Sequence, residues 1–202
     1  VQERLFSATK VWTRSKWHGE LQMRNSQRLW RSERLDLIQV HNLLDWQTHL
    51  ETLNAWKEQG QLRYTGITTS HGRRHRAFEQ IMADKVIDFA QFTYNIVDRE
   101  AEKRLLPLAA DRGMAVIINR PFRRGALIEA LHGKPLPGWA GEIGCTTWPQ
   151  FLLKFILSHP AVTCAIPATS NPAHMRENLH AGRGIMPDAA MRDRMAAYVR
   201  DI

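Results

Sequence analysis

Residues 35–42 read Leu35-Asp36-Leu37-Ile38-Gln39-Val40-His41-Asn42, an apolar run that ends in a histidine. Residues 5–12 read Leu5-Phe6-Ser7-Ala8-Thr9-Lys10-Val11-Trp12, a second run of strand length that carries a lysine. One helix-sized stretch separates the two runs, so we expect neighbouring strands of a parallel sheet. Such sheets carry their chemistry at the carboxyl ends of the strands. The sequence therefore predicts Lys10 and His41 at the same sheet edge.

The alternation of strand and helix continues along the chain. We predict strands over residues 5–11, 35–40, 62–68, 87–93, 114–118 and 163–166. We predict helices over residues 20–31, 74–82 and 188–200. The apolar spacing within residues 46–56, 101–109 and 152–156 predicts three more helices. A further helix is predicted to begin near Pro172. Six strands that alternate with helices indicate a parallel α/β fold.

The predicted architecture is a TIM (β/α)8 barrel that lacks about its first two strand–helix units. A complete barrel needs about 250 residues, whereas this chain has 202 and starts on a predicted strand. We treat residues 1–202 as a single domain with an irregular loop region at 119–146, which is rich in glycine and proline. A doubly wound open sheet is the alternative, but no Gly-x-Gly-x-x-Gly turn follows a strand.

The chain is basic, with a formal charge of +8. Such a charge favours phosphate-bearing ligands or nucleic acid. We interpret the arginines of the predicted helices as solvated helix faces and expect no nucleic-acid partner; these are Arg24, Arg28, Arg31, Arg34, Arg192 and Arg194. No apolar run is long enough to span a membrane, so we expect none, and we assign the cytoplasm by default while export stays open.

The two cysteines, Cys145 and Cys164, have neither metal-site spacing nor the spacing of a redox pair. Cys164 lies in the apolar run of residues 162–166, so we expect it to be buried in the core.

Lys10 and His41 each have an ordinary structural interpretation. A lysine at a strand end is usually a solvated charge, and a histidine there is usually a structural hydrogen-bonding residue. Their shared edge favours chemistry instead. An ammonium lowers the pKa of a neighbouring phenol, and a neutral imidazole donates a hydrogen bond to a carbonyl oxygen. Together the two groups suit polarisation and protonation of a carbonyl.

The chain resembles the aldo/keto reductase family in the order and spacing of short segments over nearly its whole length. The segments are Ala8-Thr9-Lys10-Val11-Trp12, residues 35–42, Gly66-Ile67-Thr68-Thr69-Ser70, Gln91-Phe92-Thr93-Tyr94-Asn95, residues 105–109 with 113–116, Asn119-Arg120-Pro121-Phe122, Ala165-Ile166-Pro167-Ala168-Thr169-Ser170-Asn171-Pro172 and Glu177-Asn178. The amino-acid sequences of residues 39–42 and 119–122 are most similar to those of a bacterial subgroup of the family.

The resemblance implies a metal-free TIM barrel that reduces a small-molecule aldehyde or ketone to an alcohol with NADPH or NADH, as a monomer when complete. It matches Lys10 and His41 with the lysine and histidine of the family's catalytic tetrad. The tetrad's aspartate and tyrosine belong to strands upstream of Val1, and none of Tyr64, Tyr94 and Tyr198 matches the proton donor.

The resemblance also assigns cofactor positions. Gln91 matches the glutamine that bonds the nicotinamide carboxamide, and Thr68 and Thr69 take the places of a serine–asparagine pair. Asn119 replaces a tyrosine that stacks on the nicotinamide, so we expect altered stacking. Glu177 and Asn178 match the pair that contacts the adenine.

The 2′-phosphate clamp departs from the family pattern. A lysine and an arginine of many NADPH-preferring members are replaced by Ala168 and His174. Thr169, Ser170 and the helix start near Pro172 offer backbone N–H groups to a phosphate instead. We therefore expect no clear selectivity between NADH and NADPH.

Two other functions stay open. One is a non-catalytic fragment or a nucleotide-binding or regulatory member, because the tetrad aspartate and tyrosine are absent. The other is a different TIM-barrel enzyme that uses Lys10 as a Schiff-base amine. Trp17, Trp139, Trp148 and residues 123–144 are candidates for the substrate pocket wall, with packing as the favoured role.

Overall fold

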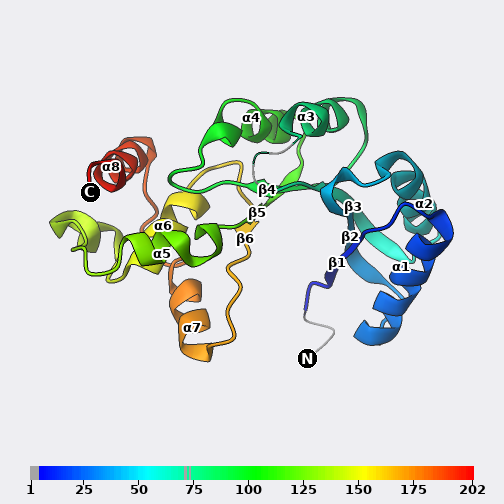
Figure 1. Ribbon diagram of the computed structural model, residues 1–202, viewed down its shortest axis with the longest axis horizontal. Coiled ribbons are helices and arrows are strands. Elements are labelled where there is room, and N and C mark those ends of the chain that lie inside the picture. The colour runs from blue at the N-terminus through cyan, green and yellow to red at the C-terminus, as the bar shows by residue number, and fades with distance from the viewer. Residues whose placement is uncertain (1–4, 71, 73) are drawn as a thin grey trace. The chain divides into compact units, whose positions relative to one another are not determined.

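The computed structural model describes residues 5–70, 72 and 74–202 (Figure 1). The chain divides into two compact units. Unit 1 comprises Val1–Gln91 and Leu108–Ala115, and unit 2 comprises Phe92–Pro107 and Val116–Ile202.

The strands follow the predicted alternation. Their bounds are β1 Ala8–Val11, β2 Leu35–Val40, β3 Leu62–Thr68, β4 Phe89–Thr93, β5 Ala115–Asn119 and β6 Cys164–Ala165. They belong to one sheet in the order β1-β2-β3-β4-β5-β6. β1 to β4 pair in parallel, and so do β5 and β6. The order in the sheet is therefore the order in the sequence.

Helices connect these strands. The α-helices are α1 Lys16–Trp30, α2 Trp46–Glu58, α3 His75–Asp84, α4 Leu105–Asp111, α5 Ala126–Ala130, α6 Trp148–Leu157, α7 Pro172–His180 and α8 Ala189–Asp201. Short 3-10 helices are η2 His41–Leu43, η3 Glu100–Glu102, η4 Arg123–Gly125 and η5 Gly138–Ile143.

Polar side chains explain two boundaries that differ from prediction. The first strand begins at Ala8, and Ser7 before it donates through N and Oγ to Asp36 Oδ2 at 2.8 and 3.0 Å. The first helix begins at Lys16, because the Ser15 side chain accepts the His18 N–H and caps it.

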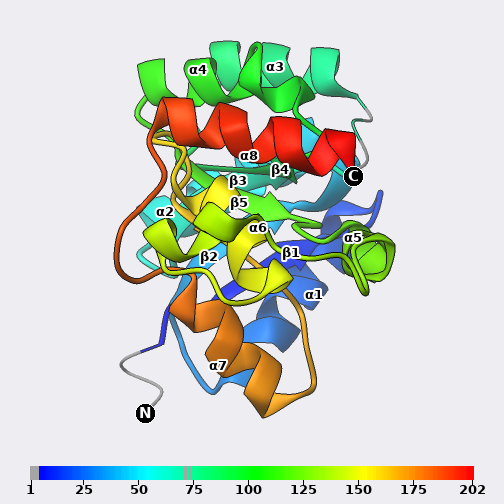
Figure 2. The same cartoon turned by 90° about the vertical axis from the view of Figure 1, so that its left-hand side faces the viewer.

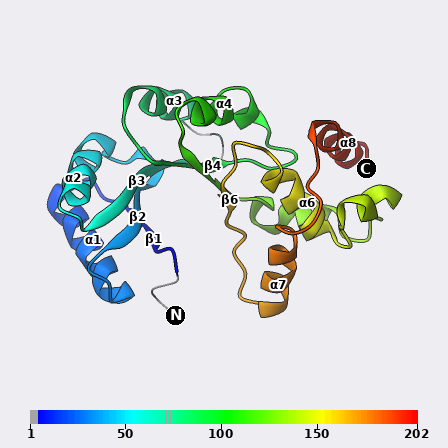
Figure 3. The same cartoon turned by 180° about the vertical axis from the view of Figure 1, so that it is seen from behind.

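The core of unit 1 lies between its strands and helices. Leu37, Ile38 and Val40 of β2 are fully buried, as is typical of a parallel strand covered on both faces. α1 and α2 lie together beside β1, β2 and β3 (Figures 1 and 3). A Cβ on Gly66 would come within 2.6 Å of the Phe89 carbonyl oxygen, so glycine permits the close approach of β3 and β4.

The core of unit 2 is built around α6, which packs with α7 and β6 (Figure 2). Phe151 and Phe155 of α6 are fully buried. Lys154 of the same helix is buried as well, and its Nζ donates to the carbonyls of Arg183 and Ile185 at 2.6 and 3.0 Å. Those bonds satisfy the buried ammonium and fix the segment between α7 and α8.

The expectations about four residues are wrong. Cys164 is half-buried rather than buried, because it lies in a short strand with β5 as its paired neighbour. Arg192 is buried rather than solvated, because it pairs with a carboxylate. Arg31 and Arg34 are exposed but lie outside the helix, since Arg31 ends α1 in a left-handed conformation.

Within residues 5–70, 72 and 74–202, no helix has the length and apolar character needed to cross a bilayer. The same residues contain no group of three or more His, Cys, Asp or Glu side chains placed to hold a metal ion.

Candidate active site

Parallel pairing in unit 1 places Lys10 and His41 near each other. Lys10 lies opposite Gln39, and Val11 lies opposite Val40, in the register of β1 and β2. His41 follows Val40 directly, at the carboxyl end of β2. Both side chains are half-buried, and the charge of Lys10 acts on the pKa of His41.

The surroundings of this pair favour uncharged groups. Burial lowers the pKa of Lys10, because desolvation disfavours an ammonium. Burial also lowers the pKa of His41, and the nearby positive charge of Lys10 lowers it further. Both effects favour the neutral form of His41, and a neutral imidazole can donate a hydrogen bond from one ring nitrogen and accept one at the other.

Two side chains fix the imidazole of His41. Its Nδ1 lies 3.2 Å from Oγ1 of Thr68, a fully buried hydroxyl at the end of β3. The ring of Trp12 lies edge-on to it, with ring centroids 5.5 Å apart and an interplanar angle of 84°. The imidazole is held between a polar and an aromatic neighbour.

The turn after β2 has a strained backbone. Asn42, Leu43 and Asp45 have φ angles of 53°, 55° and 48°, in the left-handed region that non-glycine residues rarely adopt. Thr68 Oγ1 accepts the Asn42 N–H at 3.0 Å, and Arg74 donates to the Asn42 carbonyl at 2.9 Å. The bonds to Asn42 stabilise the unusual conformation, and strain of this kind is typical of functional sites.

The other candidates of unit 1 are buried polar groups on β3 and β4. Thr68 lies opposite Gln91 in the strand register. The Thr69 N–H donates to the Gln91 carbonyl at 2.9 Å. Since Thr69 and Gln91 are both buried, the sheet edge that carries His41 also carries two amide- or hydroxyl-bearing side chains.

In unit 2, the end of β4 fixes the turn after β5. Thr93 Oγ1 donates to Asn119 Oδ1 at 2.7 Å. Asn95, which is fully buried, donates through Nδ2 to the Arg120 carbonyl at 3.2 Å. Asn119 is thus oriented as a hydrogen-bonding group, in contrast to the stacking tyrosine that the resemblance gives for this position in the family.

Three arginines of this turn have left-handed backbones and lie close together. The φ angles of Arg120, Arg123 and Arg124 are 52°, 50° and 61°. Burial and the charges of Arg124 and Arg123 lower the pKa of Arg120. Arg123 pairs with Asp98 at 3.3 Å, while Arg120 Nε has no hydrogen-bond partner among the described residues. The turn presents excess positive charge that the sequence analysis did not single out.

The remaining candidates lie at the start and on one face of α7. Asn171 caps the helix by accepting the Ala173 N–H at 2.9 Å, and Thr169 Oγ1 accepts the Asn171 N–H at 3.1 Å. Ser170 and His174 are exposed, Glu177 is half-buried and Asn178 is buried. His174, Glu177 and Asn178 share a helix face by their spacing.

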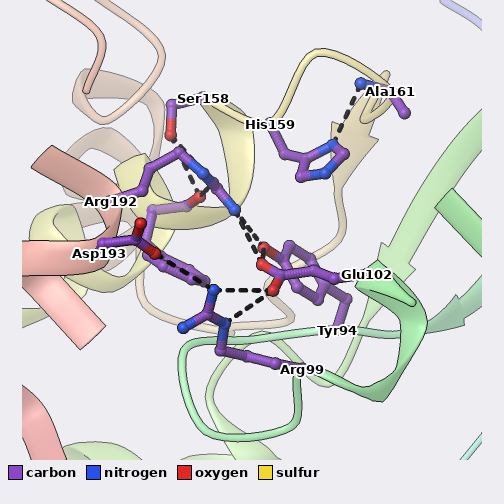
Figure 4. A network of polar contacts seen from close by, with 9 residues as sticks. Tyr94, Arg99, Glu102, Ser158, His159, Ala161, Arg192 and Asp193 are labelled. Carbon is purple, nitrogen blue, oxygen red and sulfur yellow. Dashed lines mark hydrogen bonds and ion pairs between the residues drawn. The ribbon is translucent and has the colours of Figure 1, made fainter. Parts of the chain in front are cut away.

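Tyr94 is a structural residue and not a replacement proton donor. Its side chain is fully buried, and its hydroxyl donates to Glu102 and accepts from Arg192 (Figure 4). Burial and the bond to Glu102 raise the pKa of the Tyr94 phenol. Arg192 also pairs with Glu102 at 3.0 Å, and Arg99 donates to the same carboxylate at 2.8 Å.

The tryptophans proposed for a pocket wall differ in their surroundings. Trp17 is exposed. Trp139 and Trp148 both contact Phe151 and Tyr198, which indicates packing. Trp148 additionally lines an open surface cavity of about 490 Å³.

The aldo/keto reductase family profile matches residues 2–193. This chain belongs to the aldo/keto reductase family. The family membership predicted from the short sequence segments is confirmed.

The curated relatives are less than one third identical to this chain over the residues that align. The NADH-specific methylglyoxal reductase of Escherichia coli is 31% identical over 158 residues, which cover 64% of this chain and 46% of that protein. An uncharacterised oxidoreductase of Schizosaccharomyces pombe is 27% identical over 152 residues, which cover 74% and 47%. The chain spans about half the length of these relatives.

Solved aldo/keto reductases have the same fold. The holo form of an enzyme from Bacillus halodurans matches with a TM-score of 0.78 and 22% identity, covering 98% of this chain and 73% of that one. An enzyme from Klebsiella pneumoniae in complex with NADP and acetate matches with a TM-score of 0.79 and 21% identity, covering 98% and 71%. The α/β fold of the TIM-barrel type is therefore confirmed.

The structure reveals contacts and a charged turn that sequence reasoning missed. Thr68 was assigned only to the cofactor, whereas it also contacts His41. Arg120, Arg123 and Arg124 were unassigned, although the spacing of three cations in a glycine- and proline-rich loop is visible in the sequence. Nothing in the sequence indicated the positive φ angles at these arginines.

Proposed function

We propose that the protein containing this chain reduces a small aldehyde or ketone to an alcohol with NADH or NADPH. The observation that carries the proposal is the placement of His41 near Lys10 by the register of β1 and β2 in an aldo/keto reductase fold, where burial and Lys10 lower the pKa of the imidazole. Membership of the family makes carbonyl reduction the chemistry to which this pair is best suited.

In this proposal His41 donates a hydrogen bond to the carbonyl oxygen, where negative charge develops during reduction. A reduced nicotinamide supplies the hydride when it is bound. Lys10 lowers the pKa of the phenol that donates the proton. By resemblance that phenol belongs to a tyrosine encoded upstream of Val1.

Each of the two units carries side chains suited to a part of a nicotinamide dinucleotide. Thr69 and Gln91 are buried polar groups suited to the carboxamide. The excess charge of Arg120 and Arg124, beside Asn119, suits the pyrophosphate. Glu177 and Asn178 on α7 suit the adenine, and Thr169 and Ser170 at its start suit a phosphate.

We propose that both dinucleotides are used. Ala168 and His174 offer no pair of permanent cations to a 2′-phosphate. Among relatives, one enzyme is NADH-specific by name and another was solved in complex with NADPH. The methylglyoxal reductase suggests a small aldehyde as the first substrate to test.

The second candidate function is nucleotide binding without turnover. It is favoured by Tyr94, whose hydroxyl is engaged with Glu102 and Arg192 and cannot serve as the proton donor. A third candidate, Schiff-base chemistry at Lys10, is favoured by the lowered pKa of that amine. Borohydride trapping of a substrate on Lys10 distinguishes the third candidate from carbonyl reduction.

We also propose that the complete protein is a cytoplasmic monomer that does not bind nucleic acid. The burial of Arg192 against Glu102 supports the last point, because it removes one cation from the surface. Sedimentation measurements on the complete protein, with and without a DNA duplex, test the oligomeric state and nucleic-acid binding.

The complete protein is assayed with methylglyoxal and either dinucleotide by the loss of nicotinamide absorbance. We expect turnover that falls by at least about 100-fold in His41→Gln and in Lys10→Met, since each change removes a group acting on the reacting atoms. His18→Gln and Lys16→Met, at exposed positions of α1, are the matched controls. Full activity of His41→Gln would contradict the assignment.

A further inference from the structure

The hydroxyl oxygen of Thr68 accepts one hydrogen bond from the backbone. Thr68 ends β3, is 1% exposed, and accepts the Asn42 N–H at 3.0 Å. A backbone N–H is always a donor, so this bond uses one lone pair of Oγ1. The hydroxyl proton and the second lone pair are left for other partners.

His41 is the remaining partner. Oγ1 of Thr68 lies 3.2 Å from Nδ1 of His41, and the Thr68 hydroxyl makes no further hydrogen bond among residues 5–70, 72 and 74–202. If Nδ1 carried the imidazole proton, the buried Thr68 hydroxyl would have no acceptor for its own proton. Leaving a buried donor unsatisfied costs about 1–3 kcal/mol.

We propose that Thr68 is a positioning residue that donates its hydroxyl proton to Nδ1 and so holds His41 as the neutral tautomer with its proton on Nε2. In that tautomer Nδ1 is the acceptor and Nε2 is the donor. The proton is thereby placed on the nitrogen that does not face Thr68.

The electrostatics of the site act in the same direction. Lys10 and burial both disfavour a second proton on the ring. The ring of Trp12 lies 5.5 Å from the imidazole, centroid to centroid, and packs against one side of it. Nε2 makes no hydrogen bond to any residue in the described part of the chain, so its N–H is free for a ligand.

The consequence for activity rests on the proposed carbonyl reduction. An Nε2–H group that already points away from Thr68 donates to a carbonyl oxygen without reorganisation. The opposite tautomer would present a lone pair to that oxygen and repel it. Thr68 would then affect the rate of reduction without touching the substrate.

A purely structural role for Thr68 is the competing explanation. Its bond to Asn42 stabilises the turn after β2 whatever the tautomer of His41. Thr68→Val removes the hydroxyl at nearly constant shape, and Thr68→Ser keeps it. Thr65→Val is a matched control, because Thr65 is equally buried on the same strand and its hydroxyl contacts Asp88 instead.

The test is long-range proton–nitrogen NMR on the complete protein labelled with ¹⁵N-histidine, above neutral pH. His41→Gln assigns the signals. We expect the Nε2–H pattern for His41 in the wild type, in Thr68→Ser and in Thr65→Val. We expect mixed or reversed tautomers in Thr68→Val.

Kinetics provide the second readout. We expect the kcat of Thr68→Val to fall by at least about tenfold, and that of Thr68→Ser to be restored, because the tautomer controls hydrogen bonding in the transition state. The rates are compared at saturating dinucleotide, because Thr68 is also a predicted cofactor position and its replacement can weaken binding as well. An unchanged kcat in a folded Thr68→Val would overturn the positioning role.

The wild-type spectrum alone decides the tautomer, even if Thr68→Val fails to fold. An Nδ1–H pattern in the wild type would overturn the proposal, and so would an unchanged pattern in a folded Thr68→Val. The expected tautomers without any carbonyl reduction by the wild type would support the tautomer assignment and contradict the proposed function.

Discussion

The hydroxyl oxygen of Thr68 lies 3.2 Å from Nδ1 of His41. Val40 of β2 lies opposite Ile67 of β3 in the strand register. His41 follows Val40, and Thr68 follows Ile67. The parallel register therefore brings a buried hydroxyl to a strand-end imidazole. Lys10, from the neighbouring strand β1, adds its charge to the same imidazole.

Replacement of Lys10 by glutamine is predicted to raise the pKa of His41. The ammonium repels a proton on the imidazole, so its removal favours the protonated ring. An NMR titration of the His41 ring protons measures the change. Lys16→Gln, at an exposed position of α1, is the control and should leave the titration unaltered. An unchanged or lower pKa of His41 in Lys10→Gln would show that the two groups are uncoupled.

The free energy of unfolding is predicted to decrease as the pH falls below about 6.5, the ordinary histidine pKa. The folded state lowers the pKa of His41. The unfolded state therefore takes up a proton first, and stability is lost down to the folded pKa. His159, with its pKa lowered by burial and by Arg192, acts in the same direction.

Urea unfolding at several pH values measures this dependence. His41→Gln should show a smaller loss of stability over the acidic window than the wild type. His159→Gln gives the contribution of the second histidine. Identical pH dependence in the wild type and His41→Gln would contradict the lowered pKa of His41.

Replacement of Arg192 by methionine is predicted to destabilise the fold by about 3 kcal/mol, because it removes the buried guanidinium that bonds the Tyr94 hydroxyl, the Glu102 carboxylate and the Phe155 carbonyl. Urea unfolding again provides the measurement. The control is Arg200→Met, on the same helix, where the side chain is 75% exposed. Equal stabilities of the two variants would mean that the network in Figure 4 contributes little.

Replacement of Ala168 by lysine is predicted to create a preference for NADPH. One charge-assisted hydrogen bond to a 2′-phosphate contributes about 1.5–3 kcal/mol, or roughly 10- to 100-fold in Kd. Fluorescence titration of the complete protein gives the Kd of each dinucleotide. The wild type should bind the two within about tenfold, and Ala190→Lys, at an exposed position of α8, should not change their ratio. A hundredfold NADPH preference in the wild type would contradict the absence of a phosphate clamp.

The sequence predicted the bounds of β2 and β3 correctly, because parallel strands that are buried on both faces form continuous apolar runs. It missed the burial of Arg192, since helical spacing describes one helix and the partners Tyr94 and Glu102 lie 98 and 90 residues away. It placed Lys10 and His41 at one edge from strand order alone.

The bond between His41 and Thr68 could not be predicted in the same way. It depends on side-chain rotamers and on the strained backbone of Asn42, and local sequence specifies neither. The predicted assignment of Thr68, Thr69, Gln91, Asn119, Thr169, Ser170, His174, Glu177 and Asn178 to the cofactor stays a prediction.

The measurement that tests the account most directly is deuteride transfer by the complete protein. The assay supplies NADH or NADPH deuterated at the transferable position of the nicotinamide, with methylglyoxal as the carbonyl substrate. Carbonyl reduction predicts an alcohol product that carries the deuterium on carbon, formed much more slowly by His41→Gln. Tight dinucleotide binding with no deuterated alcohol from any aldehyde or ketone tested would contradict the account and favour the non-catalytic function.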